Sequence, residues 1–229
     1  MHIPDGFLSG EVAAVAAVVA AGAVAYGLRR AESTLDERRV PLLGVTGAFV
    51  FAAQMLNFPV AGGTSGHFLG AALAAVLLGP WLACLVLAVV ISTQAFVFAD
   101  GGITALGANV LNMGVVGALL VGGLMLGARR MLPRTRTALL ATAGAGAWLA
   151  VMAGAAATAV EIGLSGTVAL GTVLPAMLGV HVLIGVGEAV VTVAAVSAVL
   201  ATRPDLIHAL EGSPGDYDAT APLPAGATT

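Results

Sequence analysis

The sequence contains no lysine, a single cysteine and few charged residues of any kind. Of its 229 residues, 9% are charged and 59% are hydrophobic, and the mean hydropathy is +1.02. Soluble domains carry about 25% charged residues, so a chain of this composition must have lipid as its main solvent. The single cysteine, Cys84, excludes an intramolecular disulfide framework and is expected to be a small buried hydrophobic residue.

The lack of lysine excludes one class of activity. A phosphate-binding P-loop requires the lysine of its Gly-Lys-Ser/Thr motif, so the chain cannot hydrolyse ATP by that machinery. We therefore expect a non-enzymatic protein, and any ATP-driven role would need its motor from another subunit. Neither an organic cofactor nor a nucleic-acid partner is expected.

Long apolar runs fill most of the chain and predict an all-α, polytopic membrane bundle of about seven transmembrane helices. The seven segments run over residues 11–28, 41–58, 66–79, 81–99, 105–127, 138–160 and 172–201. A full crossing takes about 20 residues, so the third segment is short. It opens with GGTSGHF, which predicts a helix that begins within the membrane and is buried by protein rather than by lipid.

The basic residues are all arginines, and their positions predict the orientation of the bundle. They lie between the first and second segments, between the fifth and sixth, and after the seventh: Arg29, Arg30, Arg38, Arg39, Arg129, Arg130, Arg134, Arg136 and Arg203. With seven spans these three places fall on one side, which the positive-inside rule makes cytoplasmic. The N-terminus is then outside and the C-terminus cytoplasmic, in the plasma membrane of a bacterium or an archaeon.

Three parts of the chain follow from this pattern. Residues 1–10 form a candidate metal-binding segment, and residues 11–201 form the transmembrane bundle. Residues 202–229 are a polar, Pro/Gly-rich cytoplasmic tail that we expect to be disordered.

The chain begins MHIPDGFLSG, which is unlike a cleavable signal peptide because no Lys or Arg precedes an apolar core. The Met1 amine, the His2 amide nitrogen and His2 Nδ1 can close a five-membered and a six-membered chelate ring on one ion. A fourth nitrogen would complete a square, a geometry that favours Ni(II) or Cu(II). The turn sequence Pro4-Asp5-Gly6 can then fold the terminus back towards the bundle.

His67 is the natural fourth ligand, at the outer start of the third segment behind a glycine-rich stretch that lets backbone approach closely. The candidate metal site therefore consists of Met1, His2 and His67. Each histidine alone has a simpler interpretation: His2 as an ordinary terminal residue, and His67 as a hydrogen-bonded histidine inside the membrane. Spacing alone does not bring them together.

Further polar residues lie in the outer halves of the predicted spans: Gln54, Asn57, Thr64, Ser65, Gln94, Thr104, Asn109 and Asn112. Such residues either support a site or hydrogen-bond one helix to another. His181 and Glu188 are seven residues apart on one helical face and could pair, relay protons or hold the last span to its neighbours. We favour the structural role.

Three stretches carry a resemblance to a known family: MHIPDGFL at residues 1–8, GGTSGHFLG at 62–70 and ADGGITALGANVLNMG at 99–114. Over about residues 1–200 the sequence resembles the CbiM/NikM family, the substrate-capturing S components of energy-coupling-factor importers for cobalt and nickel. The resemblance implies a square-planar nitrogen site made by the terminal amine, the amide and imidazole of the second residue, and one further histidine. Those positions are matched here by Met1, His2 and His67.

The resemblance also implies a function and partners. Co2+ or Ni2+ would be captured with high affinity as transported substrate, with cobalamin synthesis as one destination of cobalt. A membrane coupling subunit and two cytoplasmic ATPase subunits would energise import, and a small accessory membrane subunit is expected as a separate chain. The alternatives are a self-sufficient metal channel or secondary permease, and a structural membrane scaffold. The sequence does not separate cobalt from nickel.

Overall fold

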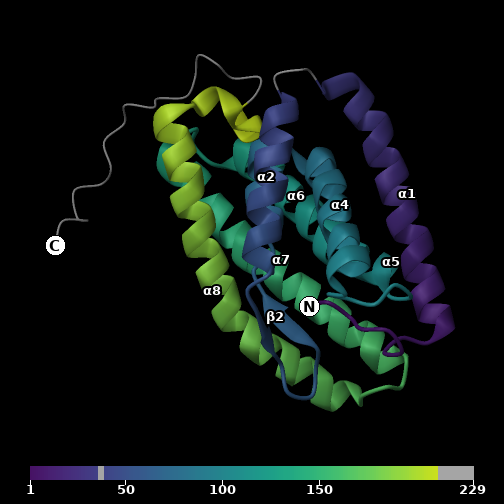
Figure 1. The fold of residues 1–229 in the computed structure, drawn as a ribbon. Helices are drawn as coiled ribbons and strands as arrows, with labels where there is room; N and C mark the ends of the chain where they lie inside the picture. Colours follow the sequence, from purple (N-terminus) through teal and green to yellow (C-terminus); the bar gives the residue numbers. More distant parts are fainter. Residues whose placement is uncertain (36–38, 211–229) are drawn as a thin grey trace.

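The computed structural model describes residues 1–35 and 39–210, which form a helical bundle with one short β-hairpin (Figure 1). The helices are α1 (Gly10–Thr34), α2 (Arg39–Gln54), α3 (Ala71–Leu78), α4 (Pro80–Phe98), α5 (Leu106–Asn109), α6 (Gly117–Met131), α7 (Arg136–Leu164) and α8 (Leu170–Thr202). A π-helical stretch, Val110–Val116, joins α5 to α6 in one helical segment. Two 3-10 turns, Pro204–Leu206 and His208–Leu210, follow α8.

Five helical segments are long and apolar enough to cross a membrane: Gly10–Glu32, Pro80–Phe98, Leu106–Met131, Arg136–Leu164 and Leu170–Thr202. The prediction of a polytopic, predominantly helical membrane bundle is therefore confirmed. Two of the seven predicted spans are nevertheless shorter than a full crossing. α2 has 16 residues and α3 has eight, which gives lengths of about 24 Å and 12 Å at 1.5 Å per residue, against a hydrocarbon core of about 30 Å.

The segment predicted as the third span, residues 66–79, does not begin as a helix. Instead β1 (Asn57–Pro59) and β2 (Ser65–His67) pair as an antiparallel hairpin, and α3 starts only at Ala71. The residue before this helix, Gly70, has φ 74°, a left-handed conformation that favours glycine and ends the extended chain there. The prediction that protein encloses the helix is confirmed, because all eight residues of α3 are buried.

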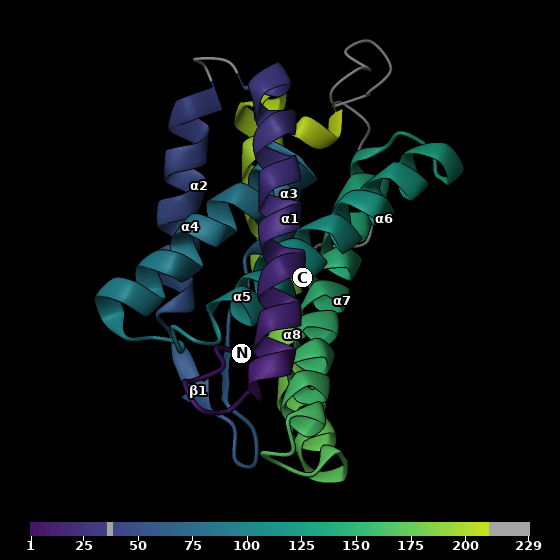
Figure 2. The same ribbon diagram turned by 90° about the vertical axis from the view of Figure 1, so that its right-hand side faces the viewer.

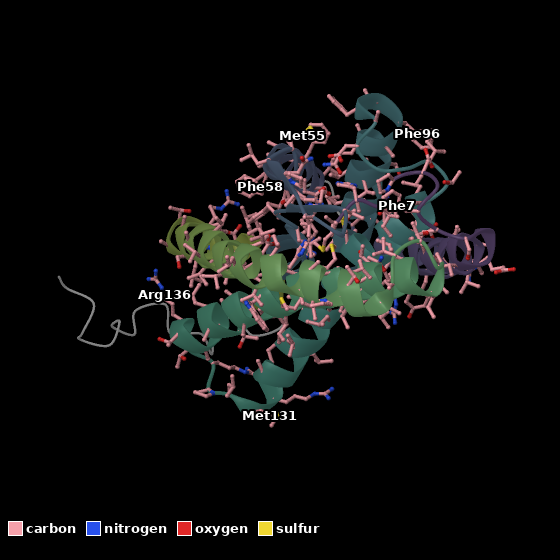
Figure 3. All side chains as sticks on the ribbon, turned by 90° about the horizontal axis from the view of Figure 1, so that it is seen from below. Phe7, Met55, Phe58, Phe96, Met131 and Arg136 are labelled. Carbon is pink, nitrogen blue, oxygen red and sulfur yellow. The ribbon has the colours of Figure 1, made fainter. Side chains whose placement is uncertain are left out.

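α3 lies at the centre of the bundle, in contact with α2, α4, α6, α7 and α8. Small residues allow this close packing: a methyl group added at Gly117 of α6 would lie 2.8 Å from the side chain of Ala71. The periphery is apolar instead. Phe58, Phe96 and Met131 are 59%, 62% and 85% exposed, and they lie at the rim of the bundle when it is viewed from the hairpin end (Figure 3). An apolar exterior of this kind suits a lipid environment.

The helix ends that carry arginines lie at one end of the bundle, the upper end in Figures 1 and 2. The hairpin and the α7–α8 turn lie at the other end, which agrees with the grouping of arginines expected from the sequence; Arg38 lies outside the described residues. The first part of the tail, which we expected to be disordered, is folded. Residues 204–206 and 208–210 form the two 3-10 turns, and Ile207 between them is buried in the hydrophobic core. The remainder of the tail, residues 211–229, is outside the described residues.

Candidate metal site

The first three residues are buried inside the bundle. Residues 1–3 are 0%, 3% and 0% exposed, respectively. A turn follows them, in which Phe7 N donates to Pro4 O at 3.4 Å and Gly6 has φ 83°. The turn predicted at Pro4-Asp5-Gly6 is therefore confirmed, and it folds the start of the chain back into the protein before α1 begins.

The connection between α4 and the π-helical segment holds this terminal segment by its main chain. Asn109 receives a hydrogen bond from Ile3 N (2.8 Å) and returns one from Nδ2 to Ile3 O (3.1 Å). Gly102 N also donates to Ile3 O at 2.8 Å. Asp5 Oδ1 accepts from Thr104 N (2.7 Å) and from its hydroxyl (2.5 Å). Because the buried backbone groups of Ile3 are paired, the segment can lie in an apolar interior at little cost.

His67 reaches the same place from strand β2. It is fully buried, and its Nδ1 lies 2.7 Å from the carbonyl oxygen of Phe68. A carbonyl oxygen only accepts hydrogen bonds, so Nδ1 must carry the proton, and Nε2 keeps its lone pair. Nε2 has no hydrogen-bond partner among the residues that the structure describes.

Two helices fix the backbone directly after His67. From α8, Glu188 accepts hydrogen bonds from Leu69 N and Gly70 N, both at 2.7 Å. From α2, Gln54 Nε2 donates to Leu69 O at 2.7 Å. The strand that carries His67 is thus attached to both sides of the bundle.

The three predicted site residues converge. The imidazole rings of His2 and His67 are stacked, with centroids 4.7 Å apart and planes inclined by 28°. The amino group of Met1 donates to the main-chain oxygen of Ser65 and, at 3.0 Å, to its hydroxyl oxygen. Within the described chain, neither ring nitrogen of His2 has a hydrogen-bond partner. Three unpaired ring nitrogens, two of His2 and one of His67, therefore lie in one buried region, and the terminal amine precedes His2 by one residue.

Burial also disfavours the protonated forms of these nitrogens. It lowers the pKa of the Met1 amino group well below its ordinary value, and nearby Asp100 opposes this only in part. Burial, followed by the charge of the terminal amine, lowers the pKa of His2 to about 3. Burial lowers the pKa of His67 well below its ordinary value, and the charges of the amine and of His2 act in the same direction. Metal ligands must be deprotonated to bind, so the site is poised to accept a cation.

A hollow of about 660 Å³ adjoins His2, lined by the terminal segment, the hairpin and the α4–α5 connection. In it, Asp100 Oδ2 lies 3.7 Å from His2 Nε2 and accepts from Asn57 Nδ2 at 3.3 Å. The next residue, Gly101, has φ 95°, and a Cβ there would lie 3.0 Å from His2 Nδ1. The sequence alone does not assign a role to Asp100 or Gly101. The feature that could have identified them is an Asp followed by two glycines in an otherwise apolar chain, because glycines permit close approach of the backbone to another group.

Most of the other polar residues singled out from the sequence support the site or join helices. The exceptions are Thr64, whose hydroxyl donates to Met177 Sδ at 3.9 Å, and Gln94, whose side chain has no hydrogen-bond partner among the described residues. The terminal segment is hydrogen-bonded by Asn109, Thr104 and Ser65. Gln54 donates to Leu69 O, two residues after His67, and Asn57 donates to Asp100, which lies beside His2 in space. Asn112 instead joins two helices, since its Nδ2 donates to Glu161 Oε2 at 2.6 Å.

His181 and Glu188 bind different partners. His181 Nδ1 lies 2.6 Å from Met177 O in its own helix, whereas Glu188 receives its hydrogen bonds from residues 69 and 70. Glu188 thus attaches α8 to a neighbouring segment, as the structural interpretation predicts.

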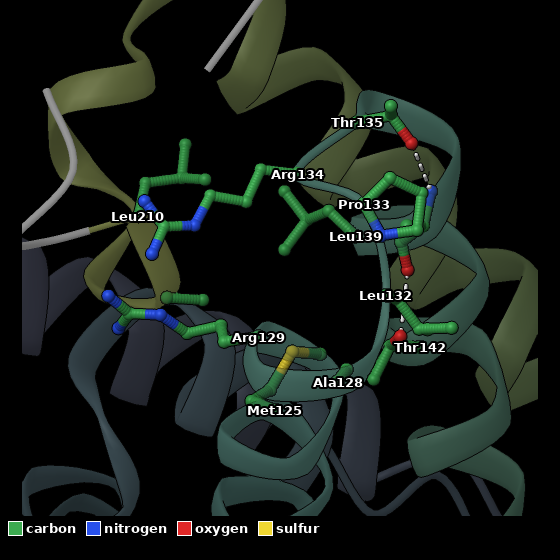
Figure 4. A pocket seen from close by; sticks show the side chains of 12 residues that line it. Met125, Ala128, Arg129, Leu132, Pro133, Arg134, Thr135, Leu139, Thr142 and Leu210 are labelled. Atoms are coloured by element: carbon green, nitrogen blue, oxygen red, sulfur yellow. Dashed lines mark hydrogen bonds between the residues drawn. The ribbon is translucent and has the colours of Figure 1, made fainter. Parts of the chain in front are cut away.

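A second hollow lies at the opposite, arginine-bearing end, between the α6–α7 connection and Leu210 (Figure 4). Its lining is largely apolar, with Arg129 and Arg134 at its side. The described residues that line it include no His, Cys, Asp or Glu, so this lining offers no typical ligand for a divalent cation.

A multi-helix membrane bundle with a buried cluster of nitrogen donors is typical of membrane proteins that handle transition-metal ions. The comparison with protein families agrees, because residues 2–206 match the CbiM family model, described as the cobalt uptake substrate-specific transmembrane region. The chain belongs to the CbiM family.

Relatives and solved structures support the same assignment. A protein of Haloquadratum walsbyi with the provisional name of a metal transport protein is 42% identical over 209 residues, covering 90% of this chain and 93% of that protein. One from Archaeoglobus fulgidus, provisionally named the fused nickel transport protein NikMN, is 40% identical and covers 91% of this chain and 68% of that protein. The crystal structure of a truncated transition metal transporter superposes with a TM-score of 0.82 at 32% identity, over 88% of this chain and 99% of that one.

Proposed function

We propose that this protein is the substrate-capturing membrane component of an energy-coupling-factor importer, and that it binds Co2+ or Ni2+ as cargo. The observation that carries the proposal is the meeting of His2 and His67, whose rings stack 4.7 Å apart with three ring nitrogens buried and unpaired within the described chain. The family assignment supports transition-metal uptake. The site residues would be the amine of Met1, the amide and imidazole of His2, and the imidazole of His67.

Chemistry determines which nitrogen of each residue would bind the metal. His67 Nδ1 is occupied by Phe68 O, so His67 binds through Nε2. His2 binds through Nδ1, because only that nitrogen closes a six-membered ring with its own amide. Four nitrogens in a square suit low-spin Ni(II) best, and Cu(II) would bind at least as tightly by intrinsic affinity. Selection against copper then rests on the supply of the metal and on the surrounding loop.

Transport needs a source of energy outside this chain. The proposed partners are a membrane coupling subunit, two cytoplasmic ATPase subunits and a small accessory membrane subunit. The competing hypothesis is a self-sufficient channel or secondary permease, in which substrate sites lie near the bilayer midplane between repeated halves. The candidate ligands here lie towards the hairpin end, which favours the first hypothesis.

Two measurements test the proposal. Purified protein in lipid nanodiscs is titrated with Ni2+ and with Co2+ by calorimetry, and one ion per chain is expected with at least micromolar affinity. Cells that express the chain alone and cells that also express the coupling and ATPase subunits are then compared for uptake of 63Ni or 57Co. Uptake that depends on the partners and on ATP is expected. Equal, ATP-independent uptake by the chain alone would favour the permease.

A further inference from the structure

Glu188 is an acidic residue placed deep in an apolar protein. It is 1% exposed and is the one residue among Asp, Glu, Lys and Arg in the 33 residues of α8. A buried carboxylate is unfavourable unless hydrogen bonds compensate for the lost water. Both oxygens of Glu188 are compensated by main-chain donors from one place, Leu69 N and Gly70 N, each at 2.7 Å.

Those two donors lie at the start of helix α3. Gly70 is the residue that precedes its first turn, so the carboxylate stands at the positive end of the helix dipole. The opposite side of this turn is closed by α2, since a Cβ on Gly70 would lie 2.6 Å from Val50 and Gln54 Nε2 bonds Leu69 O. The turn is therefore fixed from two sides.

The peptide group between Phe68 and Leu69 connects this turn to His67. Its carbonyl oxygen accepts the hydrogen bond from His67 Nδ1 at 2.7 Å, and its N–H donates to Glu188 Oε2 at 2.7 Å. A peptide group is planar and rigid, so fixing the N–H also fixes the direction of the carbonyl. A charged acceptor on the N–H further polarises the carbonyl and strengthens the bond that it accepts.

α8 is also in close contact with the strand itself. A methyl group added at Gly66, the residue before His67, would lie 2.5 Å from Ile184 Cδ1. One face of α8 thus runs along β2 and the turn that follows, with Ile184 against the strand and Glu188 against the turn.

We propose that Glu188 is a positioning residue for the metal site: through the Phe68–Leu69 peptide it holds the His67 imidazole with Nδ1 protonated and Nε2 directed at the cargo ion. This inference rests on the proposed function, because it gives His67 a ligand's role. Carboxylates commonly orient metal-binding histidines by direct contact; here one peptide group stands between the two.

The test is a double-mutant cycle between Glu188 and His67, read as Ni2+ affinity by calorimetry in nanodiscs. Glu188→Gln keeps the shape of the side chain but loses the charge and places an NH2 group against a main-chain donor. In the otherwise unchanged protein we expect a 10- to 100-fold loss of affinity, on the order seen for residues that support metal ligands. In the His67→Ala background the same substitution should cost less than about threefold, because there is no ligand left to position.

Glu161→Gln is the matched control, since it makes the same chemical change at a partly buried carboxylate bonded to Asn112. It should leave affinity within about twofold. Thermal unfolding is followed for each variant, so that a loss of fold is recognised. If Glu188→Gln does not fold, Gln54→Leu takes its place in the cycle. This substitution removes the hydrogen bond from Gln54 Nε2 to Leu69 O, and the same coupling to His67 is expected.

An equal loss of affinity in both backgrounds would overturn the inference, because it would show a general effect on the protein rather than on His67. Failure of the proposed site has a different signature, in which His67→Ala alone leaves Ni2+ affinity unchanged. The two results are read from different arms of the same cycle.

Discussion

The amino group of Met1 is hydrogen-bonded to Ser65, through the main-chain oxygen and, at 3.0 Å, through the hydroxyl. The side chain of Met1 fills space on the other side, where a methyl group added at Gly154 of α7 would lie 3.2 Å from its sulfur. The terminus is thus enclosed, with no exposed surface on Met1. A chain terminus normally lies at the surface in water, so the enclosure of this amine is the feature that its proposed role as a ligand would explain.

A single glycine added before Met1 is therefore expected to abolish tight metal binding. The added residue converts the amine into an amide and moves the new amine by about 3.6 Å, out of reach of a chelate with His2. We expect at least a 100-fold loss of Ni2+ affinity, about 2.7 kcal/mol, measured by calorimetry on purified protein with its N-terminus verified by mass spectrometry.

The control carries the same glycine at the C-terminus, after Thr229, and should bind as the unextended protein does. If the N-terminally extended protein bound Ni2+ with the affinity of this control, the amine would have no part in the site.

Removing the second imidazole should weaken binding without abolishing it. His67→Ala leaves three nitrogens from residues 1 and 2 and opens one corner of the square to water, a weaker ligand for Ni2+. We expect at least a 100-fold loss of affinity, about 2.7 kcal/mol, and a visible absorption band shifted to longer wavelength. His208→Ala, at the opposite end against Gly79, should change neither. An unshifted band in His67→Ala would show that His67 is not a ligand.

The sequence predicts the helices well and their limits less well. Hydropathy locates all seven helical segments because lipid-facing residues must be apolar, but it cannot distinguish a helix that lipid surrounds from one that protein surrounds, as in α3. The β-hairpin was missed for a physical reason. Its strands have three residues each, which is too few for a recognisable alternation of polar and apolar residues. The pairing of Asn57 with His67 is a tertiary contact, which the local sequence of either strand does not specify.

The candidate site could be predicted in part for a similar reason. The chelating capacity of Met1 and His2 is local, since it depends on neighbouring atoms of one dipeptide. The approach of His67 depends on the hairpin, on Asn109 and on Glu188, which are distant in sequence and are brought together only by folding. The hydrophobic periodicity of the sequence does not predict which main-chain group a buried Asn or Glu will bind.

The affinity for Ni2+ should fall about tenfold for each unit of pH between 8 and 6. Binding releases the amide proton of His2, and one proton released per ion gives that slope. The direction of the other shifts matters here: burial lowers the pKa of His2 to about 3 and that of the terminal amine well below its ordinary 8.0. The low pKa of His2 means that its imidazole adds no further proton in this range, and the lowered pKa of the amine reduces the proton that the amine would add. Calorimetry in buffers of different ionisation enthalpy counts the protons.

Two outcomes would contradict this expectation in different ways. A release of two or more protons at pH 7 would mean that the amine keeps an ordinary pKa. An affinity that does not change from pH 8 to pH 5.5 would mean that the His2 amide is not a ligand at all.

The final prediction concerns Asp100, whose Oδ2 lies 3.7 Å from His2 Nε2 in the hollow beside the site. When His2 binds a metal through Nδ1, Nε2 carries the proton, and a carboxylate at this distance is placed to accept it after a small approach. Asp100→Ala removes that acceptor together with a negative charge that faces the cation. We expect a 10- to 100-fold loss of Ni2+ affinity, and a smaller loss for Asp100→Asn, which keeps an accepting oxygen.

Glu11→Gln is the control for this experiment, because it removes an equal charge from an exposed position at the start of α1, near the same end of the bundle. It should leave affinity unchanged within about twofold, since exposed charges are screened by salt and water. Equal losses in Asp100→Ala and Glu11→Gln would reduce the role of Asp100 to that of general negative charge. A loss confined to Asp100, larger for Ala than for Asn, would instead show that an accepting oxygen beside His2 is needed, because the two substitutions remove the same charge.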